Sequence, residues 1–469
     1  MAKFFKYKSL DEIREDVRRL GLSIEFSDEL ERIFEPVSLF GRKAGNAMTV
    51  QPMEGCDGTL DGRPDELTFR RYQRFSRGGA KVIWGEATAV TEDGRANPRQ
   101  LWINDNTWED FARLADLMRR EHKNRFRHVD DFIIGLQLTH SGRWSHRRPV
   151  IAVHNPLIDP FTFIDKKKRV SIPEDYPVIS DDELQRLEDA FVHAARLAQK
   201  AGFDFIDLKQ CHSYLLNELL GARTRDGAYG GPFENRTRFI RNVVSRIRED
   251  APGLALASRI NIYDGIPWVC DARTRTGSPV TLEKPPTDGF GIDPRNAFEI
   301  DYTEPIRLIR MLKDLGVDFF NLSMGSPYYN AHIGRPYEKP APDMYEAPEH
   351  PLIGVDRHFR ATSTIKAALP DAVVVGTGYS WLRFFFPHAA EANIRNNRVN
   401  FAGLGRGALA YPDFAADLME KGELNRKKVC LAVSFCTALM RRKDNELGQF
   451  PAGCVPRDPV YTKIWHGNE

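Results

Sequence analysis

The chain has 469 residues, of which 42% are hydrophobic and 28% are charged, as is ordinary for a globular protein with a large core. Its 67 basic and 65 acidic residues give a net charge of only +2. A nucleic-acid partner is therefore not expected, because binding to a phosphate backbone needs a concentrated basic surface.

Three further features describe the class of protein. Six cysteines are too few for a disulfide scaffold in so long a chain. The N-terminal segment MAKFFKYKSLDEIREDV lacks the apolar centre of a signal peptide, and no run approaches the roughly 18 apolar residues of a membrane span. We therefore expect a cytoplasmic protein without a membrane partner.

The first 45 residues predict an amphipathic helical arm, with Ser9 and Ser27 as the N-caps of two helices. After it, short apolar runs alternate with segments of helical period. The strand candidates are AMTVQPM, KVIWGEATAV, FIIGLQLTH, FDFIDLKQ, LALASRINIY, VDFFNLSM, AVVVGTGY and NFAGLGRGAL. The helix candidates are 107–122, 181–202, 235–249, 303–316 and 356–369.

Strands that are apolar along their whole length, with helices between them, predict a parallel sheet covered on both faces. Eight such units favour a (β/α)8 TIM barrel, and a doubly wound open sheet is the alternative. We expect a helical arm over 1–45, the barrel over 46–420 and a C-terminal extension over 421–469. The segment 266–300 predicts a long loop after the fifth strand, of the kind that often has a function.

Reactive side chains of a parallel barrel lie at the carboxyl ends of its strands. The polar candidates there are Glu54, Glu86, Gln137, His140, Lys209, His212, Tyr214, Arg259 and Ser323. Glycines follow the last two strands at Gly376, Gly378 and Gly405, and Arg406 comes next. Each glycine alone could serve a tight turn, but the pair of motifs ending in Arg406 favours a phosphate site.

The segment GFDFIDLKQCHSYLLNELLGARTRDGAYGGPFENRTRF (202–239) combines an apolar strand, two polar residues three positions apart, a tyrosine, and the elements Tyr-Gly-Gly and Glu-Asn-Arg. This ordered pattern resembles the signature of the Old Yellow Enzyme and dienoyl-CoA reductase family. The resemblance extends over roughly residues 35–420.

The resemblance implies flavin mononucleotide (FMN) as cofactor. Pro52 and Met53 stand where the family's Pro-Met turn lies against the flavin, and Gln137 where a glutamine binds its pyrimidine side. Arg259 corresponds to an arginine near flavin N1 and the C2 carbonyl. Four residues correspond to the phosphate contacts: Gly376, Gly378, Gly405 and Arg406. We add Glu54 and Glu86, which follow or end the first two strands, to the expected cofactor contacts.

The implied chemistry passes hydride from NADH or NADPH, through the flavin, to a small activated (α,β-unsaturated) substrate. Lys209 and His212 would polarise the substrate, and Tyr214 would supply the proton. Lys209 stands where the family usually has histidine, and its charge suggests an anionic substrate group. Glu54 replaces a small residue; its carboxylate would either lower the flavin's potential or turn away into solvent.

Longer family members bind an iron–sulfur cluster through four cysteines after the barrel. Here Cys430 and Cys454 stand near the outer positions, Val433 occupies the second and Cys436 is one residue out of register. Such a cluster requires four thiolates at fitting spacing. We therefore expect neither an iron–sulfur cluster nor another metal.

Alternatives stay open. Amine dehydrogenases and demethylases resemble the same family, and Tyr328, Tyr329 and Trp381 could hold a cationic amine. From another class, Lys209 could form a Schiff base in a flavin-free barrel lyase. A flavin-binding protein without turnover is a further alternative. The choice between NADH and NADPH, the physiological substrate, the direction of catalysis and assembly into a homo-oligomer are not determined by the sequence.

Overall fold

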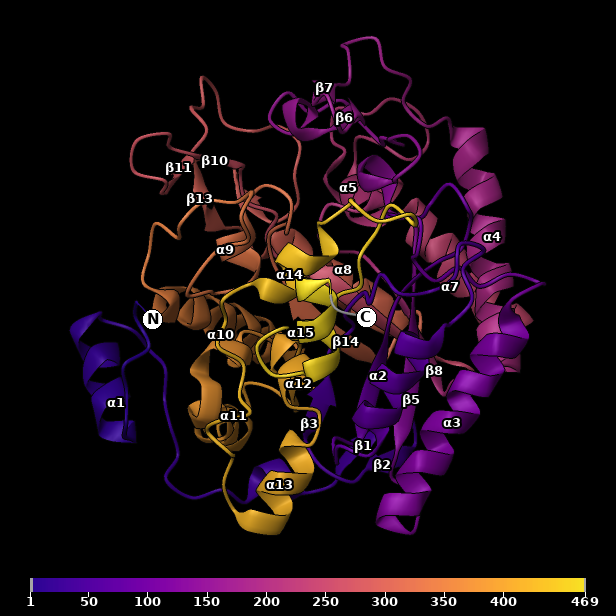
Figure 1. Ribbon diagram of the computed structural model, residues 1–469. Helices are drawn as coiled ribbons and strands as arrows, with labels where there is room; N and C mark the ends of the chain where they lie inside the picture. The colour runs from indigo at the N-terminus through magenta and orange to yellow at the C-terminus, as the bar shows by residue number, and fades with distance from the viewer. Residues whose placement is uncertain (1–2, 468–469) are drawn as a thin grey trace.

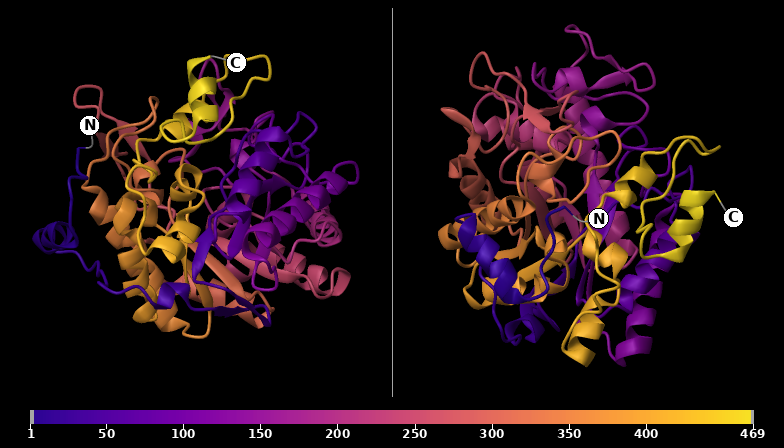
Figure 2. Two further views of the ribbon diagram at one scale, coloured as in Figure 1. Left: turned by 60° about the horizontal axis from the view of Figure 1, so that its bottom comes forward. Right: turned by 60° about the vertical axis from the view of Figure 1, so that its left-hand side comes forward.

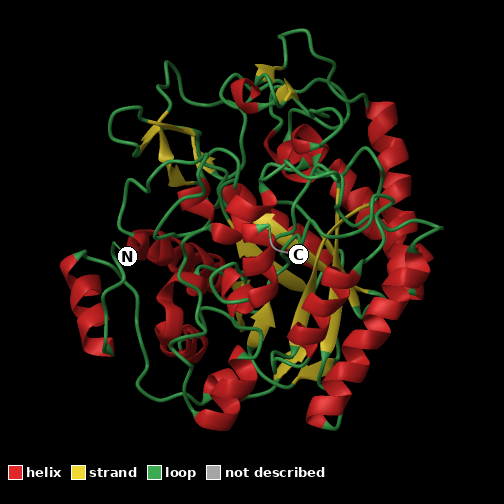
Figure 3. Cartoon of the chain, viewed as in Figure 1, coloured by secondary structure: helices red, strands yellow, loops and turns green. Residues whose placement is uncertain are grey.

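The computed structural model describes residues 3–467, and within this range eight parallel strands close into one barrel (Figures 1 and 3). The barrel strands are β3 (Met48–Val50), β4 (Val82–Ala89), β5 (Ile133–Thr139), β8 (Phe205–Leu208), β9 (Ala255–Asn261), β14 (Phe319–Ser323), β15 (Val373–Gly376) and β16 (Phe401–Leu404). Pairing of β16 with β3 closes the ring. The predicted (β/α)8 barrel is confirmed, and each strand candidate contains one of these strands.

Helices surround the barrel (Figure 3). They are α1 (Leu10–Arg19), α2 (Glu66–Ser76), α3 (Trp108–Phe126), α4 (Asp181–Lys200), α5 (Leu215–Gly221), α6 (Phe233–Arg236), α7 (Arg238–Asp250), α8 (Thr303–Asp314), α9 (Ala331–Gly334), α10 (Pro351–Ala368), α11 (Phe386–Arg395), α12 (Arg406–Ala410), α13 (Phe414–Lys421), α14 (Phe435–Met440) and α15 (Pro459–His466). The 3-10 segments are η1 (Arg32–Phe34), η2 (Gly142–Trp144), η3 (Asp159–Phe161) and η4 (Tyr379–Phe385). The one helix predicted over 235–249 is divided at Thr237 into α6 and α7.

One end of the barrel is closed by the hairpin of β1 (Val37–Leu39) and β2 (Arg42–Ala44), at the bottom of Figure 1. Leu39 and Ala44 pack in one buried cluster with aromatic residues inside the barrel, namely Trp84, Phe205, Phe319 and Phe401. This end is therefore filled by side chains, as expected of a barrel of this size. Space for a ligand is left at the opposite end, where the strands terminate.

Two excursions extend above that opposite end (Figure 1). The first carries β6 (Phe163–Asp165) and β7 (Val170–Ser171). The second, after β9, is the segment that the sequence predicted as a long loop. It contains two antiparallel pairs, β10 (Trp268–Cys270) with β11 (Gly277–Pro279) and β12 (Ile292–Asp293) with β13 (Asn296–Ile300).

The N-terminal arm runs along α10 and α11 (Figure 2). Ser9 caps α1 as predicted, but the helix expected after Ser27 is wrong: only η1 forms there. The reason is tertiary, because the backbone amides of residues 31–33 donate to the buried carboxylate of Glu391 instead of starting a helix. The amides of residues 3–5 likewise donate to Glu338.

The C-terminal extension contains α14 and α15, and lies against α2 through a cluster that includes Leu67, Leu439 and Tyr461. Asp458 caps α15 and accepts hydrogen bonds from Arg70 of α2. The extension is thus attached to the barrel. In the described part of the chain, no helix is both long and apolar enough to cross a membrane.

Candidate active site

Two adjoining hollows lie at the carboxyl ends of the barrel strands. The glycine-side hollow, about 230 Å³, is lined by residues that follow β3, β15 and β16. The tyrosine-side hollow, about 310 Å³, is lined by residues that follow β3 and β8 and by the C-terminal extension. Both are lined by Pro52, Met53, His212, Arg259, Pro327, Arg335 and Arg406, so they form one continuous site.

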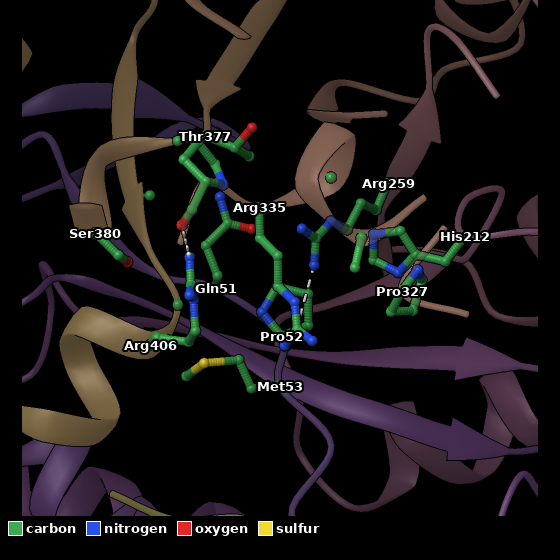
Figure 4. A pocket seen from close by; sticks show the side chains of 16 residues that line it. Gln51, Pro52, Met53, His212, Arg259, Pro327, Arg335, Thr377, Ser380 and Arg406 are labelled. Carbon is green, nitrogen blue, oxygen red and sulfur yellow. Dashed lines mark hydrogen bonds between the residues drawn. The ribbon is translucent and has the colours of Figure 1, made fainter. Parts of the chain in front are cut away.

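The lining of the glycine-side hollow combines the backbone of glycine residues with the side chains of arginine residues. Thr377, Gly378, Ser380, Gly403 and Gly405 line it, and Gly378 has a left-handed backbone conformation (φ +96°). Figure 4 shows Arg335 and Arg406 at this hollow, and Arg406 donates to the carbonyl of Pro336 at 2.6 Å. Burial, followed by the neighbouring Arg406, lowers the pKa of Arg335 to about 10. Two guanidinium groups held close together favour a multiply charged anion such as a phosphate.

A polar cluster joins the floor of the two hollows. The carboxylate of Asp207 accepts from the side chain of Gln137 and from the backbone N–H of Arg259. Arg259 in turn donates to the carbonyl of Pro52 at 3.3 Å (Figure 4). Burial raises the pKa of Asp207 to about 6. Asp207 therefore orients two of the predicted cofactor contacts, a role that sequence reasoning missed because Asp207 lies within an apolar strand.

Lys209 and Tyr214 lie together in the tyrosine-side hollow. The Lys209 ammonium is 3.4 Å from the centre of the Tyr214 ring, and both residues are buried. Burial lowers the pKa of Lys209 and raises the pKa of Tyr214 well above its usual value. Tyr214 Oη contacts Tyr328 Oη at 3.1 Å and Glu54 Oε2 at 3.5 Å.

His212 lines both hollows from the turn after β8, where it and Ser213 both have positive φ (+65° and +59°). Such conformations are strained for residues other than glycine, and they cluster at functional sites. The Nε2 atom of His212 lies 3.1 Å from Ser323 Oγ. Burial, with the nearby charge of Arg259 next in size, lowers the pKa of His212 well below its usual value. His212 is therefore neutral near pH 7, and a neutral imidazole can both donate and accept.

The structure does not bring two of the predicted contacts to the site. Glu86 lines neither hollow; it is the extra residue of a β-bulge in β4, which turns it towards α2. There it forms a buried ion pair with Arg71 and accepts from the Gly55 amide. Gly376 also lines neither hollow, and a β-carbon added to it would meet Val399 and Tyr379.

The sequence missed several residues that tertiary contacts bring to the site. Arg335 comes from the loop after β14, and the C-terminal extension contributes Cys436, Thr437, Met440, Arg441, Lys443, Gln449 and Ala452 to the tyrosine-side hollow. Apart from Cys436, which stands one residue out of register in the incomplete iron–sulfur pattern, these positions carry no local motif. A run of cationic residues in the extension (RRK, 441–443) was the only available signal.

The cysteines of the extension are free thiols. Cys430 and Cys454 belong to one buried cluster with Ala410, whereas Cys436 lines the tyrosine-side hollow. Among residues 3–467, no group of three or more His, Cys, Asp or Glu side chains is arranged to hold a metal ion. The expected absence of an iron–sulfur cluster stays a prediction.

The donor set of the glycine-side hollow fits FMN. Buried nitrogen donors of Gln51, Arg259, Arg335 and Arg406 have no hydrogen-bond partner within the described chain. Buried donors are normally paired, so these point to a ligand rich in acceptors. Gly378, Gly403, Gly405 and Arg406 would hold the phosphate, while Gln51, Pro52, Met53, Gln137 and Arg259 would contact the flavin ring. Bound there, flavin would supply reversible hydride transfer.

Comparison with known proteins agrees with this fit. The model of the NADH:flavin oxidoreductase / NADH oxidase family matches residues 32–272. An NADPH dehydrogenase from a Geobacillus species is 32% identical over 222 residues, which cover 46% of this chain and 59% of that protein. One from Clostridium acetobutylicum is 26% identical over 82% of this chain and 93% of its own length.

A solved complex of 2-naphthoyl-CoA reductase with 2-naphthoyl-CoA has the same fold, with a TM-score of 0.66 at 16% identity over 93% of this chain and 58% of that chain. Since the family model covers more than half of the residues, the chain belongs to the NADH:flavin oxidoreductase / NADH oxidase family.

Proposed function

We propose that this protein uses FMN to transfer hydride from NADH or NADPH to an activated carbon–carbon double bond. The observation that carries the proposal is the grouping of Lys209, His212 and Tyr214 in a hollow that adjoins the FMN-compatible site. Family membership supports flavin-dependent oxidoreduction, whereas the substrate is inferred from these side chains alone.

The chain's own residues have distinct tasks in this proposal. Lys209 and neutral His212 donate hydrogen bonds to an oxygen of the substrate, which withdraws electrons from the double bond. Tyr214, whose hydroxyl remains protonated because burial raises its pKa, provides the proton. Tyr328 stacks on Trp144, with ring centres 4.0 Å apart and an interplanar angle of 8°, and keeps Tyr214 Oη in place.

We further propose that the substrate is an acid. Six cationic side chains line the tyrosine-side hollow, and Glu54 is the one carboxylate in that lining, although Arg441 is also paired with Asp343 outside it. The cations are Lys209, Arg259, Arg335, Arg406, Arg441 and Lys443. A phosphate would balance only part of this charge. Because buried charges are normally paired, the remainder favours a carboxylate on the substrate.

A spectrum tests the flavin chemistry first. Purified protein is reconstituted with FMN, and its visible absorption is recorded without oxygen before and after NADH or NADPH. Bleaching by one nucleotide, reversed by an activated alkene, is the expected result. A protein that cannot bind FMN would refute the proposal. A flavin that both nucleotides leave oxidised, but that amines reduce, would favour the dehydrogenase alternative.

Substrate charge is tested with monomethyl fumarate and dimethyl fumarate, because they differ by one negative charge. We expect Lys209→Met to lower kcat/KM for the monoacid at least tenfold more than for the diester. A similar loss for both esters would contradict the proposed role of Lys209 in binding an acid.

A further inference from the structure

Glu54 occupies a distinctive position beside the proposed proton donor. Its Oε2 lies 3.5 Å from Tyr214 Oη, while its Oε1 accepts from the side-chain amide of Asn97 and lies 3.7 Å from Cys56 Sγ. Glu54 is half-buried and lines the tyrosine-side hollow. The carboxylate thus lies between the Tyr214 hydroxyl and the open space of the tyrosine-side hollow.

Tyr214 needs a source of protons if it acts once in every turnover. Its side chain is buried, and among the described residues its hydroxyl forms hydrogen bonds only with Tyr328 and Glu54. Tyr328 is itself a phenol whose pKa burial raises to a value above that of free tyrosine. A phenolate left on Tyr214 would therefore be costly in this environment, and Glu54 is the more acidic of its two neighbours.

We propose that Glu54 relays protons from solvent in the hollow to Tyr214, through the contact between Oε2 and Oη. This inference rests on the proposed function, because it concerns the same reduction. Glu54 acts through Tyr214 and is assigned no contact with the reacting carbons.

The proton balance is complete. One alkene carbon receives hydride, whose two electrons come ultimately from the reduced nicotinamide. The π electrons of the alkene form a C–H bond at the other carbon with the proton of Tyr214 Oη. The O–H bond of Tyr214 breaks and leaves a phenolate. The proton of the Glu54 carboxyl then moves to Oη, and water in the hollow reprotonates Glu54.

The surroundings of Glu54 determine whether it carries a proton near neutral pH. Burial raises its pKa, against the opposing charges of Lys209, after β8, and Lys443, in the extension. The cation of Arg95 also acts on it, and the other titratable groups that face it are Tyr214, Tyr328 and Cys56. The two lysines and Arg95 favour the carboxylate. An ionised Glu54 has no proton to give to Tyr214, so the relay should weaken as pH rises through the pKa of Glu54.

The experiment separates the two half-reactions. FMN-loaded protein is reduced with dithionite, so that no nicotinamide is needed, and is then mixed with monomethyl fumarate in a stopped-flow instrument. Flavin reduction by NADH or NADPH is measured separately. Wild type is compared with Glu54→Gln, which keeps the size and the hydrogen bond to Asn97, with Glu54→Ala and with Tyr214→Phe.

We expect Glu54→Gln to slow flavin reoxidation at least tenfold more than flavin reduction, and to remove an ionisation from the pH profile of reoxidation. Formate should restore part of the rate to Glu54→Ala. Glu54→Gln should add little to the defect of Tyr214→Phe, because both interrupt one path. A readout independent of turnover is the infrared carbonyl band of a protonated carboxyl, which should titrate in wild type and be missing in Glu54→Gln.

Wild-type rates in Glu54→Gln, or absence of that infrared band, would overturn the relay. A slow Glu54→Ala variant that formate does not restore would indicate a purely structural role and also overturn it. These outcomes differ from failure of the proposed function, in which wild-type flavin is not reoxidised by any alkene.

Discussion

Arg406 offers a sharp test of the cofactor site. Its Nη2 donates to the Pro336 carbonyl, while Nη1 is buried and has no partner in the described chain. A phosphate in the glycine-side hollow would give Nη1 its acceptor. One charge-assisted hydrogen bond contributes about 1.5–3 kcal/mol. Arg406→Ala should therefore weaken FMN binding about 10- to 150-fold, since about 1.4 kcal/mol corresponds to a factor of ten.

The assay is titration of apoprotein with FMN, followed by quenching of flavin fluorescence. Arg406→Lys retains the charge but not the planar fork, so it should fall between wild type and Arg406→Ala. Arg442→Ala is a control in the same end of the molecule, because Arg442 pairs with Asp444 and does not line either hollow. Riboflavin, which lacks the phosphate, should bind wild type and Arg406→Ala alike.

An FMN dissociation constant within twofold of wild type in Arg406→Ala, with the fold intact by circular dichroism, would refute the reasoning. Equal losses for FMN and riboflavin would also refute it, because the guanidinium would then act on the ring or on the fold and not on the phosphate.

Three further predictions concern buried charges and close packing in the barrel. Arg71→Met should destabilise the protein by about 3–5 kcal/mol in urea unfolding, because it leaves Asp57 and Glu86 as unpaired buried carboxylates; a loss below 1 kcal/mol would contradict this. Gly403→Ala would push its methyl group into the side-chain amide of Gln51, a residue that would contact the flavin ring. FMN affinity should therefore fall, and unchanged affinity would contradict the close packing of Gly403 against Gln51. Burial lowers the pKa of His122 to about 4, so stability present at neutral pH is lost as pH falls from about 6.5 towards 4. About 2 kcal/mol of that loss should be present at pH 5 and absent in His122→Gln, as measured by urea unfolding at both pH values.

Much of this protein could be predicted from local sequence. The eight apolar runs favoured the barrel over a doubly wound open sheet, because parallel strands buried on both faces need continuous apolar side chains. The ends of those strands then located Lys209, His212, Tyr214 and Arg259, since all parallel strands end at the same face of the barrel. Only positions along the chain were needed for these inferences.

Tertiary structure decided where other side chains point. A bulge in β4 turned Glu86 away from the site. The carboxylate of Glu391 accepts hydrogen bonds from the backbone amides of Glu31 and Ile33, in the segment after Ser27 where a helix was expected. Arg335 and Lys443 reach the hollow from loops far along the chain. Burial and neighbouring charges set the pKa of Glu54 and His212. The periodicity of a sequence reports which face of an element is buried, whereas bulges, long-range hydrogen bonds and burial depend on segments that meet only in the folded chain.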